Sequence, residues 1–170
     1  MLTVDRIKTL LNLEPHPAEG GFFVETYRAD ESVPAAALPP RYRGERVFGT
    51  AIYYLLAPDT FSAMHRLASD EVFHFYLGDP VKMLLLAPDG TGRIVTLGQD
   101  LPKGMRPQVI VPRGVWQGSR LVPGGRFVLL GTTVAPGFEF ADYEHARRAD
   151  LLGSHPAFRD LILSLTSTDA

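Results

Sequence analysis

Two short segments, residues 61–78 and 104–117, constrain this chain most. In the first, His65 stands six residues before Glu71, and Glu71 stands seven residues before Gly78. In the second, the turn Pro112-Arg113-Gly114 ends three residues before Gln117. Both segments border apolar runs, so an imidazole, a carboxylate and an amide are expected to face the inside of a sheet-built fold.

The stretch between residues 47 and 135 predicts an all-β fold. Short runs of β-branched, aromatic and aliphatic residues are separated by turns rich in Gly and Pro, such as residues 88–92. Many short strands with regular turns are typical of a barrel or jelly roll. The predicted strands span residues 21–28, 47–56, 71–77, 81–87, 93–97, 108–111 and 127–135.

Helices are expected only near the two ends. Residues 3–11 predict a short helix capped by Thr3. Residues 142–152 predict a second helix, and Ser154 is expected to cap a third with its apolar face toward the body. That face comprises Phe158, Leu161, Ile162 and Leu165. Residues 29–46 show no period and are expected to form a loop.

Composition narrows the function classes. The 170 residues carry a net charge of −2, no basic block and no cysteine. Nucleic-acid binding lacks its electrostatic footprint, and disulfides and thiolate metal sites are excluded. No signal peptide or membrane-length apolar run is evident. We therefore expect one cytoplasmic domain over residues 1–170, with neither a nucleic acid nor a membrane as partner.

The two segments resemble the paired motifs of the cupin barrel, which normally carry two histidines and a glutamate, then a third histidine. Leu67 and Gln117 occupy the positions of the second and third histidines. His65, Glu71 and, weakly, Gln117 are thus candidate ligands of a divalent metal such as Fe, Mn, Ni, Cu or Zn. If Glu71 faces the lumen, strand alternation turns His74 away, unless a bulge intervenes.

Metal-free acid–base chemistry is the competing interpretation. His65 can exchange a proton near neutral pH, with Glu71 or Asp70 orienting its ring. A tyrosine would serve as the opposing acid, and the sequence does not rank the four candidates Tyr27, Tyr53, Tyr54 and Tyr76.

Several other residues have simpler interpretations. Trp116 can line a pocket or belong to the core. Glu25 and Arg28 are expected to form an ion pair, across a subunit interface rather than at a ligand. The remaining histidines, His16, His145 and His155, are expected at the surface.

The longer strings resemble the DUF985, or cupin-5, family of RmlC-like cupins. The strings are 16–28, 50–56, 65–80, 111–118, 133–138 and 140–143. The resemblance implies a double-stranded β-helix, a jelly-roll barrel with short N- and C-terminal helices, usually dimeric, and a small-molecule ligand in the barrel. Its core would span about residues 21–138, followed by a helical segment at about 142–166. Carried over by position, the cavity residues are His65, Glu71, His74 and Gln117, with Tyr27 and Trp116 in the wall.

Three functions remain open at this point. The first is an epimerase or isomerase acting on a polar, sugar-like or carboxylated ligand, with His65 as base and Glu71 as its partner or a metal ligand. The second is a non-catalytic protein that binds a small metabolite. The third is a metal-dependent oxygenase, which the missing histidines disfavour. A homodimer paired through residues 21–28 is also expected.

Overall fold

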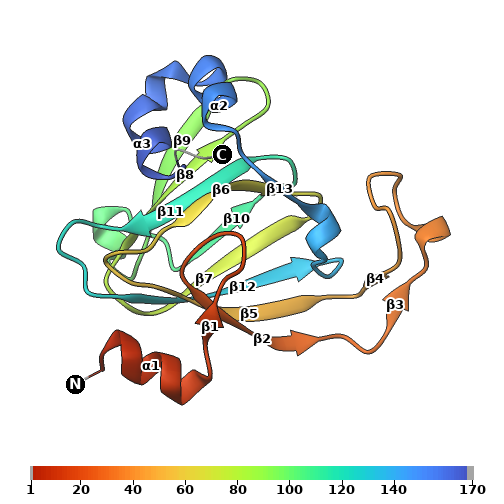
Figure 1. Cartoon of the computed structure of the whole chain (residues 1–170), viewed down its shortest axis with the longest axis horizontal. Helices are drawn as coiled ribbons and strands as arrows, with labels where there is room; N and C mark the ends of the chain where they lie inside the picture. Colours follow the sequence, from red (N-terminus) through yellow and green to blue (C-terminus); the bar gives the residue numbers. More distant parts are fainter. Residues whose placement is uncertain (1, 168–170) are drawn as a thin grey trace.

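The computed structural model describes residues 2–167 and confirms the all-β prediction (Figure 1). A six-stranded antiparallel sheet has the order β1-β2-β5-β12-β7-β10, and a five-stranded sheet has the order β13-β6-β11-β8-β9. The first sheet comprises β1 (Glu14–Pro15), β2 (Phe22–Arg28), β5 (Thr50–Leu56), β12 (Val128–Ala135), β7 (Asp70–Gly78) and β10 (Gln108–Val111). The second comprises β13 (Tyr143–His145), β6 (Ser62–Leu67), β11 (Trp116–Leu121), β8 (Val81–Leu86) and β9 (Gly92–Leu97).

Strands β6 and β11 were not predicted, although they carry His65 and Gln117. Their sequences mix polar residues and glycine with few β-branched residues, so they lack the usual strand signal. The hairpin of β8 and β9 is confirmed in register, with Leu86 opposite Gly92 across the turn. The loop at residues 29–46 contains a small two-stranded sheet, β3 (Ser32–Val33) and β4 (Arg46–Val47), and the 3-10 turn Ala35–Ala37.

The N-terminal helix is confirmed as α1 (Val4–Leu11), whose first turn is capped by Thr3. The prediction of a helix from residue 142 was wrong at its start. Tyr143–His145 forms β13 against β6, because strand pairing overrides a weak local helix preference. Helices α2 (Arg148–Ser154) and α3 (Arg159–Ser164) follow. Ser154 ends α2 and is not the cap of the next helix, although the predicted apolar face of α3 does contact the body.

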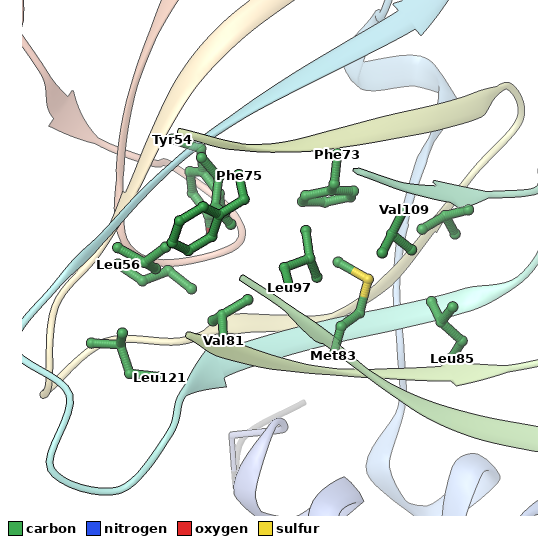
Figure 2. Packing of buried hydrophobic residues seen from close by; sticks show 13 residues of the cluster. Tyr54, Leu56, Phe73, Phe75, Val81, Met83, Leu85, Leu97, Val109 and Leu121 are labelled. Carbon is green, nitrogen blue, oxygen red and sulfur yellow. The ribbon is translucent and has the colours of Figure 1, made fainter. Parts of the chain in front are cut away.

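Strand β8 is buried on both faces, between the barrel lumen and the C-terminal helices. Its residues are apolar on both faces because Val81, Met83 and Leu85 point into the lumen, while Leu84 and Leu86 point out toward α2 and α3. The lumen side chains pack with Phe73, Phe75 and others in a continuous apolar cluster (Figure 2). That cluster fills much of the barrel interior, so polar side chains face the lumen only in its remaining part. Within residues 2–167, no helix has the length and apolarity needed to cross a membrane.

Candidate functional site

The structure brings three of the predicted residues together across the lumen. His65 on β6 and Gln117 on β11 are paired neighbours in the five-stranded sheet. Glu71 reaches them from β7 of the opposite sheet, and the Gln117 Nε2 donates a 2.7 Å hydrogen bond to the Glu71 Oε2. All three residues are buried, His65 with only 1% exposure. The predicted alternation on β7 also holds, with Glu71, Phe73 and Phe75 buried on one face.

A fourth residue, Glu19, completes the cluster and was not predicted. It lies in the loop between β1 and β2, which turns over the barrel toward β6 (Figure 1) and accepts a backbone hydrogen bond from the Ala63 N–H at 2.8 Å. Gly20 and Gly21 permit this path. Both have positive φ, and a Cβ at Gly20 would lie 2.6 Å from the Phe61 carbonyl oxygen, so a side chain there would clash.

Two histidines face the Glu19 carboxyl in opposite tautomers. The His65 Nδ1 lies 2.7 Å from the Ala63 carbonyl oxygen and must donate to it, which leaves the Nε2 of the neutral ring as an acceptor. The His16 Nδ1 accepts backbone N–H groups, including that of Glu19 at 2.9 Å, so its Nε2 carries the hydrogen. Both Nε2 atoms approach the Glu19 Oε1, His65 at 3.5 Å and His16 at 3.7 Å.

Burial shifts the protonation of this cluster toward its neutral forms. Desolvation raises the pKa of Glu19 above its ordinary value and lowers the pKa of His65 and of His16. For Glu71, desolvation and then the charge of Glu19 raise the pKa to about 7. The two carboxyl groups and two imidazoles therefore favour states of low charge near neutral pH.

A cavity of about 100 Å³ opens onto this cluster. Glu19, Glu71 and His16 line it, whereas His65 and Gln117 lie outside its lining. Leu67, at the position of the absent second histidine, is part of the wall. The aromatic side chains of Phe23, Phe138 and Phe140 form part of the apolar surface. At the buried end of the cavity, a bound molecule would meet the Glu19 and Glu71 carboxyls, with His65 behind Glu19.

The sequence matches the family model described as Cupin superfamily (DUF985) over residues 5–146. The chain belongs to the DUF985 family of cupins. An uncharacterized protein of Saccharomyces cerevisiae, YML079W, is 30% identical over 142 residues, which cover 79% of this chain and 71% of the yeast protein.

Two solved structures share the fold over nearly the whole DUF985 chain. Protein SO0799 from Shewanella oneidensis has 34% identity and a TM-score of 0.85, covering 98% of this chain and 99% of its own. A hypothetical protein from Leishmania major has 28% identity and a TM-score of 0.86, covering 97% and 99%. These likenesses establish the family and the fold.

The structure separates the other predicted site residues of this DUF985 chain from the cluster. His74 lies on the outer face of β7, stacked on Tyr76 and 3.2 Å from the Thr133 Oγ1. Trp116 lies on the outer side of β11, beneath the Arg66 guanidinium and against the cluster that α2 and α3 cover. Tyr27 is 56% exposed. A register shift between Glu25 and Tyr27 on β2 breaks the alternation that would have turned Tyr27 inward.

Among the tyrosine candidates, only Tyr54 belongs to the interior near Glu19. Its hydroxyl donates to the Gly20 carbonyl at 2.8 Å, and burial raises its pKa well above the ordinary value. Tyr53 and Tyr76 contact each other outside the barrel. Tyr143, which the sequence did not suggest, stacks on the His65 ring at 5.1 Å between centroids and shields it from solvent.

Of the three histidines expected at the surface, His16 and His155 were predicted wrongly, because their side chains are buried. The His16 side chain is 5% exposed and belongs to the site. His145 is half-buried and accepts or donates a hydrogen bond at the Tyr143 hydroxyl, 3.2 Å away. His155 is buried, and its Nε2 lies 3.0 Å from the Ala87 carbonyl oxygen, so it fastens α2 to β8. The local sequence around these histidines does not indicate their burial, because the residues that bury them are distant in the sequence.

The donor set does not fit a divalent metal. Over residues 2–167, no three His, Asp or Glu side chains converge as a metal site requires. Leu67 supplies no donor, and the Gln117 amide already donates to Glu71. The His65 Nε2 and the Gln117 Oε1 are buried without a hydrogen-bond partner, but they are joined by no set of anionic ligands at coordinating geometry. We therefore derive no chemical step through a metal.

Proposed function

We propose that this DUF985 protein is an epimerase- or isomerase-type enzyme that transfers a proton at a carbon atom of a small polar ligand. The observation that carries the proposal is the pair of cavity-lining carboxyls, Glu19 and Glu71, whose pKa values are both raised by burial. A general acid–base catalyst works best with a pKa near the working pH. Glu71, with a pKa of about 7, meets that requirement.

The two carboxyls take complementary roles. Ionised Glu71, oriented by the Gln117 amide, accepts the proton from the carbon. Protonated Glu19 supplies a proton to the ligand oxygen or the opposite face, since two neighbouring carboxyls favour unequal protonation. His65 is the positioning residue behind Glu19. Its Nε2 lone pair faces the Glu19 Oε1 at 3.5 Å, where it can orient the proton of that carboxyl until Glu19 gives it to the ligand.

Deuterium incorporation tests the proposal without knowledge of the natural substrate. The purified protein is incubated in D₂O with small hydroxycarbonyl compounds, starting with glyceraldehyde and dihydroxyacetone, and NMR follows exchange at carbon. We expect exchange above the uncatalysed rate for at least one compound. Glu71→Gln and Glu19→Gln should lower it by roughly 10²-fold or more, the scale of one general acid or base.

Two further variants separate catalysis from structure. His65→Ala should slow exchange while far-ultraviolet circular dichroism remains that of the wild type. Glu31→Gln removes an exposed carboxyl outside the cavity and should change nothing. Binding of these compounds with no exchange in the wild type would contradict the enzyme proposal and leave a metabolite-binding protein.

A further inference from the structure

We infer that the cavity takes an uncharged, hydroxyl-rich molecule and rejects carboxylates and phosphates of the same size. This inference concerns the same site as the proposed function and narrows its ligand class. It rests on the charges that line the cavity, on the saturation of the one guanidinium there, and on the volume of the cavity.

The charges that line the cavity are mostly acidic. Glu19, Glu25, Glu71 and Glu139 contribute carboxyl groups, and Arg28 is the one permanently cationic side chain among the described residues of the lining. The other basic group, His16, has its pKa lowered by burial. Glu25 and Glu139 outnumber Arg28, so an anionic ligand would meet net negative charge on this side of the cavity even where Glu19 and Glu71 are protonated. Like charge opposes binding unless a cation is free to pair with the ligand.

Arg28 is not free. Its Nε and Nη2 donate a bidentate pair of 2.9 Å hydrogen bonds to the two Glu25 oxygens. Its Nη1 donates to Glu139 at 2.9 Å, and Nη2 also reaches the Phe138 carbonyl at 3.3 Å. A guanidinium offers five N–H donors in a fixed fork, and these contacts occupy most of it. We call Arg28, Glu25 and Glu139 the Arg28 clasp.

The local sequence builds this clasp. The bulge between Glu25 and Tyr27 on β2 changes the phase of the strand, so Arg28 shares the cavity side with Glu25. Glu139 arrives from the segment after β12, where the Phe138 N–H is held by the Thr50 Oγ1 at 3.0 Å. The clasp thus cancels its own cation within the protein and offers none to a ligand carboxylate or phosphate.

The volume and the walls favour a small polyol. Because a cavity of about 150 Å³ holds benzene, this cavity of about 100 Å³ encloses roughly four non-hydrogen atoms, and the rest of a six- or seven-atom molecule would lie in its mouth. An ionised carboxyl group accepts hydrogen bonds from hydroxyl groups, and a protonated carboxyl group can also donate one to them. The aromatic rings of Phe23, Phe138 and Phe140 provide apolar walls for the C–H faces of such a molecule.

Three probes of nearly equal size test the inference: glycerol (neutral), glycerate (anionic) and serinol (cationic). Their binding is measured at neutral pH by NMR titration of the isotope-labelled full chain. We expect glycerol to bind, and glycerate to bind roughly tenfold more weakly or worse. Equal or tighter binding of glycerate, preference for serinol over glycerol, or no binding of any probe would each overturn the inference.

A double variant makes the role of the clasp explicit. Glu25→Ala with Glu139→Ala removes both carboxyl acceptors of the Arg28 fork, so the affinity for glycerate should rise by roughly tenfold while that for glycerol stays unchanged. Glu144→Ala is the matched control, because it frees Arg66 from a bidentate pair outside the cavity. A double variant that gains nothing for glycerate would refute the argument from Arg28. Since these are binding measurements, they remain separate from the exchange assay that decides the proposed function.

Discussion

Replacing Glu71 by glutamine should change how the stability of the protein depends on pH. The folded-state pKa of Glu71 is about 7, against an ordinary value of 4.5. Because the folded state holds the proton more tightly, Glu71 stabilises the fold fully below about pH 4.5, and that contribution is lost as the pH rises to about 7. The difference between these two pKa values corresponds to about 3 kcal/mol in the free energy of unfolding.

The Glu71→Gln variant keeps the shape of the side chain and an acceptor for the Gln117 amide, but its new amide group does not titrate. The free energy of unfolding of Glu71→Gln, minus that of the wild type, should therefore rise by about 3 kcal/mol between about pH 4.5 and pH 7 and level off above. Urea unfolding of both proteins across this range measures the difference.

Glu31→Gln, an exposed change, is the control. A difference between Glu71→Gln and wild type that stays constant with pH would show that Glu71 is an ordinary solvated carboxylate, and the acid–base reasoning would fail with it. Glu19→Gln offers a second readout. Because the charge of Glu19 contributes to the raised pKa of Glu71, this variant should move the pH-dependent window downward.

Two further predictions concern the scaffold. Arg46 and Asp142 form a buried bidentate pair at 2.7 and 2.5 Å that fixes the segment before β13. Arg46→Met leaves the Asp142 carboxylate unpaired and should lower the free energy of unfolding, measured by urea titration, by about 3–5 kcal/mol. The double variant Arg46→Met/Asp142→Leu should recover most of this loss. A loss below about 1 kcal/mol in the single variant would contradict the buried pair. The protein is also expected to form a homodimer through the β2 edge, because β1 pairs only with Phe22 and Phe23 of that strand. Sedimentation at micromolar concentration should show a dimer, and Thr26→Pro should weaken it. A monomeric wild-type protein would refute this prediction.

The sequence predicted the elements whose signal is local. Alternating apolar residues and Gly- or Pro-rich turns sufficed for the β8–β9 hairpin and for β10, and the Thr3 cap sufficed for α1. Strands β6 and β11 lack that signal, since Ser, His, Arg, Gln and Gly replace the usual β-branched residues. Their strand state is imposed by pairing with β8 and β13 and by burial on both faces.

The site was predictable only where motif spacing alone determined it. His65, Glu71 and Gln117 do meet in the lumen. Tyr27 was placed in the cavity wall by the family resemblance, and the register shift between Glu25 and Tyr27 leaves it exposed instead. Glu19 and His16 were missed because a loop carries them over the barrel, and no periodicity reports such a path. The signal that could have found them is the pair Gly20-Gly21, because adjacent glycines mark close approach of two backbone segments.

Leu67 and Gln117 stand at two positions that carry metal-binding histidines in the usual cupin motifs, and both affect the protonation of Glu71. In a cupin with three histidines and a glutamate, the carboxylate can be compensated by a divalent cation. Here Leu67 makes the lumen more apolar, and Gln117 gives Glu71 one neutral donor at 2.7 Å. With so little compensation, burial acts on the carboxyl directly, and its pKa moves to about 7. The absence of two usual metal ligands and the raised pKa of Glu71 thus go together, and that pKa near neutral is what the proposed proton transfer requires of Glu71.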